Sequence, residues 1–554
     1  MLGMTQHLKE HIVSERPNHA DVLIIGAGAS GGVVANHLSE NGVTVVALEQ
    51  GDWVSQGDLP GDKPQYELLA TQKWNPDPNL RQNPADYPIN QSESQGPAVH
   101  MYNGVGGSTV MFAAVWVRPT PADFFTKTLD GVGDDWPITY HDLLPFYEQT
   151  DIEFGASGIG GNPAYPPGKP PPLPPLPMGT TGRKAAEGMN ALGWHWWPGV
   201  NAIASQDHRN QAQCQRFGTC VAGCPAGAKG STDVTHWPRA IQNGVRLITG
   251  ARVQEITVDS RNRANGAVYI DREGNRQFQS ASIVVMASNG IGTPRILLMS
   301  ESGQHPNGLG NSSGLIGKRL MLHPCATVAG FFDETFDETG PSGQKINSMQ
   351  FYETDESRGF TRGAYWTLYD GVGPHFHMMR RTLAEGLEGD SFWGPSFASA
   401  MQEAAHHTVM WGLVAEDLPE EQNRILLDSS QPDTDGLPGA KVVYSLSDNT
   451  QRMIDWNCDR MREALDAAGA NRSFVFMRSV PAGHLLGTAR MGNDPETSVV
   501  NAWCQMHDVP NLYIVDGSVF VTGFGVNPTS TIAAIAKRAA THILETARSQ
   551  EIPA

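Results

Sequence analysis

The sequence predicts a mixed α/β protein built on a parallel β-sheet, with a second part of α+β character. Three observations predict this. A glycine-rich turn joins a buried strand to a helix near residue 26. Strand-like runs alternate with turns over residues 247–290, and a strand and a helix close the chain over residues 511–548. The length of 554 residues suggests two or three structural units, because a domain has about 100–200 residues.

The first strand–turn–helix–strand unit starts the predicted sheet. DVLIIGAG is an apolar run that enters a tight turn, and SGGVVANHLSENG has small and apolar residues at helical spacing. This helix ends at Gly42, a suitable C-cap, and VTVVALE follows as a second buried strand. Such a unit is the beginning of a Rossmann-like sheet, with helices packed on a mostly parallel core.

The turn of this unit carries a dinucleotide-binding fingerprint. Gly26, Gly28 and Gly31 form G-x-G-x-x-G directly after the strand. Gly26 permits the tight turn, Gly28 lets the backbone approach a pyrophosphate, and Gly31 lets the helix pack closely on the strand. The pyrophosphate is expected at the helix N-terminus, beside Ser30.

An acidic residue completes the fingerprint. Glu49 ends the second strand, 21 positions after Gly28, where a carboxylate hydrogen-bonds ribose hydroxyls. The fingerprint alone does not separate FAD from NAD. A glycine-rich turn in an ordinary α/β domain is the competing interpretation.

Other segments differ from this unit in composition and in the spacing of their apolar residues. Residues 52–100 are rich in Pro, Gln, Asp and Asn and are expected to be loops. Residues 161–178 are proline-rich, which predicts an extended linker or strap. Residues 331–477 hold many Trp, Met, Phe and His and few long apolar runs, which suggests a substrate-facing domain. A final helix is expected from about Pro528 to Ala547.

Composition excludes some functions. Apolar residues make up 40% and charged residues 18% of the chain, as in a globular protein with a sizeable core. The formal net charge of −19 argues against nucleic-acid binding, which rests on Lys and Arg at phosphates.

No run approaches the roughly 20 apolar residues that span a bilayer. The N-terminal segment has no signal-peptide pattern, so we expect a cytoplasmic protein, with co-export to the periplasm on a partner as the alternative.

Several segments resemble the glucose–methanol–choline (GMC) family of flavoproteins over almost the full length. They are DVLIIGAGASGGVVANHLSENGVTVVALEQG, NGVGGSTVMFAAVWVRP, ASIVVMASNGIGTPRILLMS, HLLGTARMG, NLYIVDGSVF and GFGVNPTSTIAAIAKRAA. The resemblance implies FAD as the cofactor. It also implies a discontinuous FAD-binding domain of residues 17–55, 96–120, 206–330 and 478–550. Residues 56–95, 121–205 and 331–477 would form loops and the substrate-binding domain.

The resemblance also implies cofactor contacts. It places a second glycine-rich segment near the flavin and pyrophosphate, and Val253 at the adenine through its backbone. An open α/β sheet binds ligands beyond the carboxyl ends of its strands, which suits the residues that follow the strand at 511–515. The sequence departs from the family near residues 287–290, where Ala-Ser-Asn-Gly replaces the usual alanine–glycine turn. The remaining cofactor-binding residues implied are Gly106, Gly107, Ser108, Asp516, Gly517, Asn527 and Pro528.

His484 and Asn527 match the family's active-site pair, 43 positions apart. Alcohol oxidation removes the hydroxyl proton and a hydride from one carbon, and the resemblance implies that flavin N5 takes the hydride. A neutral histidine is a suitable base, and an asparagine amide can hydrogen-bond the developing alkoxide. The chain has 18 histidines, most of them structural or exposed, and an Asn before Pro can instead cap a helix.

Three of the six cysteines lie close together, as Cys214, Cys220 and Cys224 followed by Pro225. The spacing resembles that of bacterial FAD-dependent sugar dehydrogenases of the glucose, fructose, gluconate and glucoside type, which implies a three-iron, four-sulfur cluster. Zinc with His208 or His236 as a fourth ligand, and plain thiols, are the alternatives. Thr235-His236-Trp237 resembles a covalent-flavin tripeptide but lies in the wrong segment. His323 is a second candidate pocket residue, for which we favour a packed structural role.

The leading hypothesis is a dehydrogenase that oxidises a CH–OH group of a sugar, glycoside or polyol and passes electrons to an acceptor. The acceptor would be a cytochrome or a quinone, reached with a small partner subunit. A flavin oxidase that reduces dioxygen to hydrogen peroxide is the main alternative. A non-redox lyase and a non-catalytic electron-transfer subunit also stay open.

Overall fold

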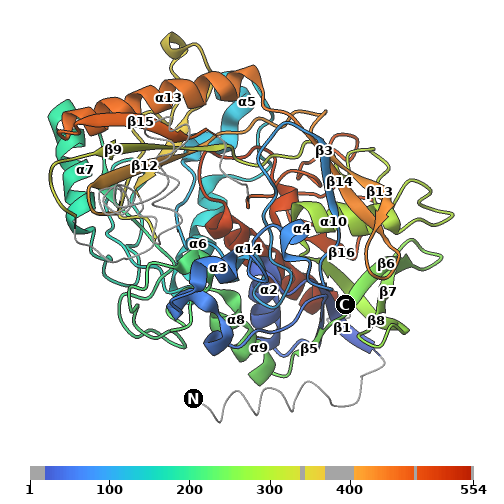
Figure 1. The fold of residues 1–554 in the computed structure, drawn as a ribbon. Coiled ribbons are helices and arrows are strands. Elements are labelled where there is room, and N and C mark those ends of the chain that lie inside the picture. The colour runs from blue at the N-terminus through green and yellow to red at the C-terminus, as the bar shows by residue number, and fades with distance from the viewer. Residues whose placement is uncertain (1–18, 337–342, 369–404, 479–482, 551–554) are drawn as a thin grey trace.

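The computed structural model describes residues 19–336, 343–368, 405–478 and 483–550, with side chains described to residue 546. The strands in this part of the chain form a seven-stranded, a six-stranded and a three-stranded sheet. Figure 1 shows the seven-stranded sheet on one side of the molecule and the six-stranded sheet at the opposite end. Residues 17–18, 337–342, 369–404 and 479–482 of the expected domains lie outside the described residues.

The predicted strand–turn–helix–strand unit is confirmed. Strand β1 (His19–Ile25) leads through the glycine turn into helix α2 (Ala29–Glu40), and strand β2 (Val45–Glu49) follows. The two strands pair in parallel, with Val22 opposite Val45. Gly42 adopts φ +80° just after the helix, a left-handed conformation that glycine takes without a steric penalty.

The seven-stranded sheet is parallel at one side and antiparallel at the other. Its order is β5-β2-β1-β8-β7-β6, and β16 pairs with the end of β8. The strands predicted over 247–290 and 511–514 are confirmed, but β6, β7 and β8 form an antiparallel meander. Short turns join these three strands, and a parallel connection would need a longer crossover. The further bounds are β5 (Arg246–Thr249), β6 (Arg252–Val258), β7 (Ala264–Ile270), β8 (Arg276–Met286) and β16 (Leu512–Ile514).

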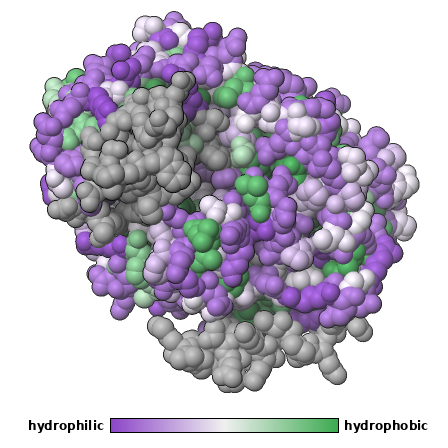
Figure 2. All heavy atoms as spheres, in the orientation of Figure 1, coloured by the Kyte–Doolittle hydropathy of each residue, from purple (hydrophilic) through white to green (hydrophobic). Residues whose placement is uncertain are grey.

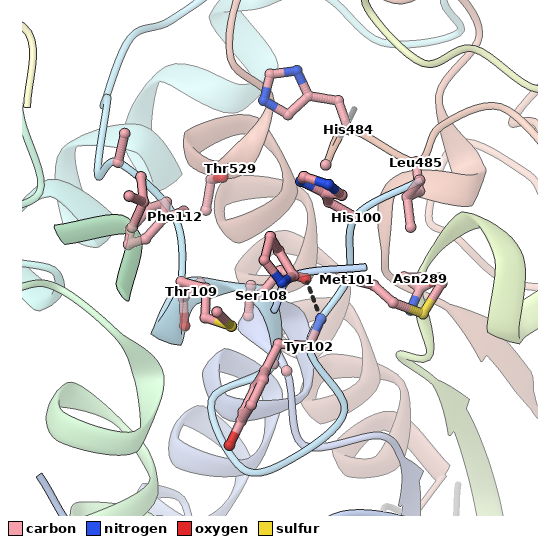
Figure 3. A pocket seen from close by; sticks show the side chains of 18 of the residues that line it. His100, Met101, Tyr102, Ser108, Thr109, Phe112, Asn289, His484, Leu485 and Thr529 are labelled. Atoms are coloured by element: carbon pink, nitrogen blue, oxygen red, sulfur yellow. Dashed lines mark hydrogen bonds between the residues drawn. The ribbon is translucent and has the colours of Figure 1, made fainter. Parts of the chain in front are cut away.

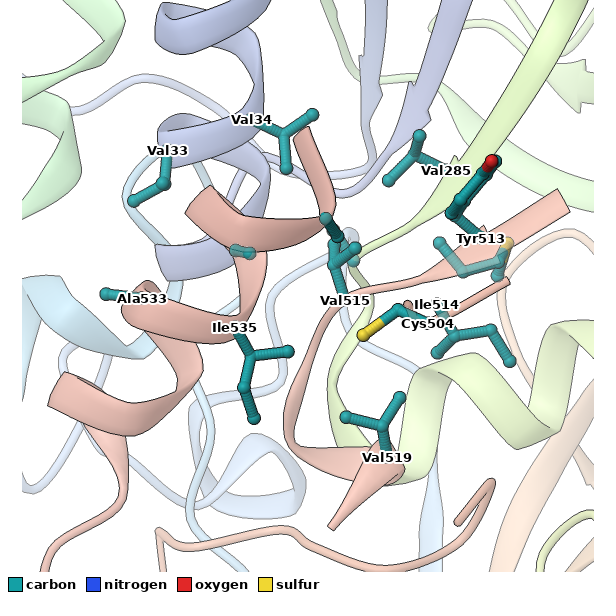
Figure 4. Close-up of a cluster of buried hydrophobic side chains, with 14 of the residues drawn as sticks. Val33, Val34, Val285, Cys504, Tyr513, Ile514, Val515, Val519, Ala533 and Ile535 are labelled. Carbon is teal, nitrogen blue, oxygen red and sulfur yellow. The ribbon is translucent and has the colours of Figure 1, made fainter. Parts of the chain in front are cut away.

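A buried apolar cluster fixes helix α2 on this sheet. Figure 4 shows Val33 and Val34 of α2 near Val285 of β8, Ile514 of β16 and Ile535 of helix α14 (Thr529–Gln550). All five side chains are buried. Full burial of one such side chain contributes about 1.5–3 kcal/mol, so the cluster holds the N-terminus of α2 in a fixed place.

The six-stranded sheet is an antiparallel layer covered by helix α13 (Asp448–Ala467), which Figure 1 shows lying along it. Helix α7 (Gly179–Leu192) packs against α13. The buried indole of Trp366 donates to Asn457 of α13 at 2.8 Å, which ties helix to sheet. The strand order is β15 (Arg472–Met477), β9 (Cys325–Phe331), β12 (Thr408–Ala415), β11 (Ala364–Leu368), β10 (Ile346–Ser348) and β4 (Trp197–Pro198).

The segment expected to be loops contains more structure than predicted. It holds the short helices α3 (Tyr66–Ala70) and α4 (Pro78–Arg81) and strand β3 (Ile89–Ser94). Strand β3 pairs in parallel with β14 (Pro438–Tyr444), which is antiparallel to β13 (Arg424–Pro432). Only the first residue of β3 is buried, and the other residues are polar. The sequence therefore shows no alternation of apolar and polar residues that would predict a strand.

The proline-rich segment is an extended strap without helix or strand. It is tied down by Leu173, whose backbone donates to the carbonyl of Ala156 at 3.1 Å and accepts from Gly158 at 3.0 Å. The Leu173 side chain is buried. The interpretation as a packed surface segment therefore agrees with the structure.

The surface is mainly hydrophilic. Figure 2 shows polar residues over most of the visible face, with hydrophobic residues scattered among them. Among the described residues, no helix combines the length and the apolar character that a bilayer crossing requires.

Candidate active site

The fingerprint glycines stand where side chains would not fit. Gly26 adopts φ +103°, and a Cβ there would lie 2.5 Å from the carbonyl oxygen of Ala287. A Cβ on Gly31 would lie 2.1 Å from the carbonyl oxygen of Gly26. The turn therefore brings the N-terminus of α2 directly against β1 and β8, as the motif predicts.

The second glycine-rich segment packs onto the first. Gly106 donates its backbone N–H to Ala27 at 2.9 Å. A Cβ on Gly107 would lie 2.6 Å from the Cα of Gly28, and Gly107 itself has φ +52°. Ser108 follows in a short 3-10 helix, Gly107–Val110, and accepts a hydrogen bond from the Tyr102 N–H at 3.3 Å (Figure 3). The two segments thus form one backbone cradle.

Glu49 is buried at the end of β2. Its carboxylate accepts from the N–H of Ala27 at 2.8 Å and from the N–H of Gly51 at 2.9 Å. Burial raises the pKa of Glu49, and these backbone hydrogen bonds act in the opposite direction. Each carboxylate oxygen has a second lone pair, so the group can also accept from ribose hydroxyls.

A cavity of about 760 Å³ extends from the glycine cradle to the six-stranded sheet. Residues of β9 and β12 line its far end. Of the predicted residues, Gly31 and Gly106 do not line this cavity, and they pack instead against Gly26 and Ala27 of the turn. The other predicted cofactor and catalytic residues line the cavity, namely Gly26, Gly28, Ser30, Glu49, Gly107, Ser108, Val253, His484, Asp516, Gly517, Asn527 and Pro528.

Two glycines bracket the segment that carries His484. A Cβ on Gly517 would lie 2.6 Å from the carbonyl oxygen of Leu485, and one on Gly290 would lie 2.4 Å from the same atom. Asp516 accepts from the Ser518 N–H at 2.9 Å and from the Thr293 hydroxyl at 2.5 Å. These contacts fix the His484 segment between β16 and helix α10 (Asn289–Met299).

The departure at residues 287–290 has a local explanation. Asn289 adopts φ +67°, which asparagine tolerates better than most residues. Its side-chain oxygen accepts from the N–H groups of Ile291 at 2.9 Å and Gly292 at 3.1 Å. The Ser288 hydroxyl donates to Ile25 at 2.9 Å. The substituted residues therefore cap α10 and hold it against β1.

His484 and Asn527 come together, as predicted. Nε2 of His484 lies 3.3 Å from Nδ2 of Asn527, and both side chains line the cavity. Burial lowers the pKa of His484 to about 4, so the imidazole is neutral at pH 7. A neutral imidazole beside an amide donor can take a proton from a hydroxyl group and orient its oxygen.

Two further histidines belong to this site. His323 is fully buried, and its Nδ1 lies 3.1 Å from Nδ1 of His484. His323 is packed, as we favoured, but it also lines the cavity, so both candidate roles hold for it. No local pattern indicated its contact with His484. His100, which we did not single out, lines the same cavity as His484 (Figure 3). Within the described residues no hydrogen bond reaches the His100 ring, and burial lowers its pKa to about 4.

The three clustered cysteines lie on one loop but do not form a ready metal site. None of the three, all of which lie in the described part of the chain, forms a disulfide, and of the three Cys220 lines the cavity. Lys229, buried behind the loop, donates to the backbone of Cys220 at 2.6 Å and of Val110 at 2.7 Å. Among the described residues, which include Cys214 and Cys224, no three His, Cys, Asp or Glu side chains group to hold a metal ion.

The histidines considered as zinc ligands have other partners. His236 is buried, with Nδ1 2.7 Å from the Thr235 hydroxyl and Nε2 3.3 Å from Glu153. Nε2 of His208 lies 2.7 Å from the carbonyl oxygen of Ile152. Fold and site together define a class: an α/β protein in which one cavity joins a glycine-rich cradle of the dinucleotide-binding type to a histidine–asparagine pair.

Comparison with known proteins identifies the family to which this α/β protein belongs. Two family models described as GMC oxidoreductase match residues 20–325 and 419–536. The chain is 39% identical over 544 residues to the 2-methyl-1,2-propanediol dehydrogenase of Mycolicibacterium austroafricanum, covering 95% of both chains. It is 28% identical over 542 residues to the fructose dehydrogenase large subunit of Gluconobacter japonicus, covering 95% of this chain and 98% of that one. A formate oxidase structure from Aspergillus oryzae aligns with a TM-score of 0.63 at 15% identity, over 97% of this chain and 100% of that one.

The chain belongs to the GMC oxidoreductase family. It is an FAD-dependent enzyme that acts on CH–OH groups, as the resemblance implied. FAD fits the structure, because the backbone of Gly28 and Gly107 and the carboxylate of Glu49 line one cavity of about 760 Å³.

Proposed function

We propose that this enzyme oxidises a hydroxyl group of a small polyol, sugar or glycoside with His484 as the base. The observation that carries the proposal is the His484–Asn527 pair, 3.3 Å apart at the cavity wall. Nε2 of His484 takes the hydroxyl proton, and the Asn527 amide donates to the oxygen as negative charge develops. A bound FAD would supply the acceptor for the hydride that leaves the same carbon, which would become a carbonyl carbon.

The substrate class is inferred from the relatives and the cavity. The relative at 39% identity is named for a small branched diol, and the one at 28% for a ketose. Both names describe compounds with neighbouring hydroxyl groups. The His100 ring, whose nitrogens have no partner among the described residues, can bind a second hydroxyl or the cofactor.

Anaerobic mixing tests this proposal. We expect 2-methyl-1,2-propanediol, fructose, glucose or gluconate to bleach the visible absorbance of the FAD-loaded enzyme without dioxygen. Bleaching measures hydride transfer directly, before any acceptor is involved. If the enzyme holds FAD and no compound of such a panel bleaches it, the redox proposal fails, and the lyase or the non-catalytic alternative takes its place.

The electron acceptor separates a dehydrogenase from an oxidase. We favour a dehydrogenase, because both curated relatives above carry that name. The oxidase alternative stays open, since a formate oxidase shares the fold. An oxygen electrode decides: slow dioxygen uptake with fast reduction of a quinone or a cytochrome supports the dehydrogenase, and stoichiometric hydrogen peroxide contradicts it. The relative named a large subunit supports a small partner subunit as part of this proposal.

A three-iron, four-sulfur cluster on Cys214, Cys220 and Cys224 remains part of the proposal, supported by their spacing and by Cys220 at the cavity. The side chains as placed do not fit a cluster, so we derive no electron-transfer step through it. Anaerobic analysis of the purified enzyme should find about three iron and four sulfide per FAD if a cluster forms. One zinc per chain, or neither metal, contradicts the cluster. Cys458→Ser, which changes a buried cysteine of α13, is a control that should leave the iron content unchanged.

We also propose the domain division that the sequence indicates. The seven-stranded sheet supports an FAD-binding domain drawn from residues 17–55, 96–120, 206–330 and 478–550, because its strands lie in these segments. The other two sheets support a substrate-binding domain. Strand β9, which begins at Cys325, pairs in the six-stranded sheet, so we place the boundary just before it.

A further inference from the structure

We propose that His323 is a positioning residue that fixes the tautomer of His484 and leaves Nε2 of His484 as the proton-accepting atom. The inference rests on the proposed function, since it assigns an atom to the proton transfer proposed above. It follows from a chain of hydrogen bonds that runs from the carbonyl of Gly523 through His323 and His484 to Asn527.

A backbone bridge brings the two histidines together. Met321 and Leu486 form an antiparallel pair, with N–H···O distances of 3.0 and 3.1 Å. His323 lies two residues after Met321, and His484 lies two residues before Leu486. The bridge thus brings the two segments together, and the rings of His323 and His484 meet edge to face with their centroids 5.1 Å apart.

The protonation state of His323 follows from the hydrogen bond that its Nε2 makes on the side of the ring away from His484. Its Nε2 lies 2.8 Å from the carbonyl oxygen of Gly523, which can only accept, so Nε2 carries the hydrogen. The ring is fully buried, and burial keeps the pKa of His323 well below its usual value. A neutral imidazole has one hydrogen, so Nδ1 of His323 is an acceptor.

The tautomer of His484 is then determined. Its Nδ1 lies 3.1 Å from the acceptor Nδ1 of His323 and must donate to it. Since His484 is also neutral, its Nε2 bears a lone pair. That lone pair faces Nδ2 of Asn527, a hydrogen-bond donor, at 3.3 Å. The donor and acceptor types therefore agree at every step of the chain.

The surroundings hold His323 rigidly. Asp417 accepts from the Leu322 N–H at 2.8 Å, and the Cys325 thiol donates to the His323 carbonyl at 3.2 Å. A Cβ on Gly523 would lie 2.7 Å from Nε2 of His323, so this glycine leaves just enough room for the ring. When Nε2 of His484 takes a proton, the hydrogen bond to His323 acquires a charged donor and becomes stronger. No proton moves to His323.

A spectroscopic test needs no substrate. In the FAD-loaded enzyme labelled with ¹⁵N-histidine, two-bond ¹H–¹⁵N correlations report which ring nitrogen carries the hydrogen. The His484 signal is identified by its loss in His484→Ala. We expect a hydrogen on Nδ1 of His484 and on Nε2 of His323. A hydrogen on Nε2 of resting His484 overturns the inference, whatever the enzyme's activity.

Variants of His323 test its effect on the reaction. His323→Asn places an amide oxygen near the position of Nδ1, and asparagine suits the φ of +49°. His323→Leu removes the acceptor. We expect the leucine variant to lower the limiting rate of flavin reduction by about 10- to 100-fold, as for one lost hydrogen bond to a charged group. The asparagine variant should stay within about threefold of the wild type, with little change in apparent substrate affinity.

Further variants separate the explanations. Gly523→Ala, which presses on the ring without changing its chemistry, should also lower the limiting rate and serves if His323→Leu fails to fold. His305→Asn is the matched control, because His305 is buried against Asn262 and does not line the cavity. Equal losses in the asparagine and leucine variants would overturn the inference in favour of a packing role. If His484→Ala keeps its rate, the proposed function itself fails.

Discussion

His484→Ala should reduce flavin more slowly than the wild type by about 10²–10⁴-fold, the usual contribution of a positioned general base. The variant should still bind FAD, because the glycine cradle and Glu49 lie on other segments. Anaerobic stopped-flow measurement with the best substrate of the panel gives the rate, and the ratio of visible to ultraviolet absorbance gives the FAD content. His305→Ala, with a buried histidine outside the cavity, should match the wild type.

The same base has a defined pH dependence. Burial lowers the pKa of His484 to about 4, so the base is already neutral well below pH 7. The rate of flavin reduction should stay level from neutral to mildly acidic pH and fall only as the pH approaches 4, where Nε2 becomes protonated. An acid limb centred near 6.5, the ordinary value for histidine, would contradict a buried, neutral base. So would a full rate in His484→Ala.

The parts of the fold that sequence could predict depend on local chemistry. The turn at Gly26 needs a positive φ, and the contact of Gly31 with its own turn needs the absence of a side chain, so glycine spacing reveals both. Buried strands β1 and β2 appear as apolar runs. The pair His484 and Asn527 was found through the residues around it, because a single histidine carries little information.

The features that escaped prediction depend on contacts between distant segments. Strand β3 forms because β14 offers an edge, and its own polar sequence shows no strand pattern. His323 meets His484 through the bridge of Met321 with Leu486, which no local pattern indicates. His100 reaches the cavity from the loop before the second glycine segment. Strand β3, His323 and His100 each owe their place to contacts with segments distant in the sequence, and such contacts override the local preference of the chain.

The cysteines show the limit of spacing as evidence. The spacing of the three cysteines along the chain predicted that their thiols bind one metal cluster. This requires a loop that turns the three side chains toward one point. The loop is instead held by hydrogen bonds from side chains to backbone carbonyls: the Thr219 hydroxyl donates to Gly61 at 2.6 Å, and the Lys229 amine donates to Cys220. A metal binds ligands that folding brings together, so spacing predicts only the candidates. Chemical analysis of iron and sulfide must decide.

Gly107→Ala should abolish FAD binding or weaken it severely. Its new Cβ would lie 2.6 Å from the Cα of Gly28, where neither backbone segment can give way without opening the cradle. Gly42→Ala is the matched control. Gly42 also has a left-handed backbone, with φ +80° against +52°, but no atom lies within 4 Å of its Cβ position. The control therefore shows the cost of the backbone conformation alone, about 1–2 kcal/mol.

The FAD content and the thermal unfolding midpoint of both purified variants check this expectation. We expect Gly42→Ala to keep a full complement of FAD with a slightly lower midpoint, and Gly107→Ala to be purified largely without FAD. If Gly107→Ala holds FAD as tightly as the wild type, the close contact of the two glycine segments is not what shapes the cofactor site. The comparison isolates steric contact from backbone strain, because both substitutions add the same methyl group to a left-handed glycine.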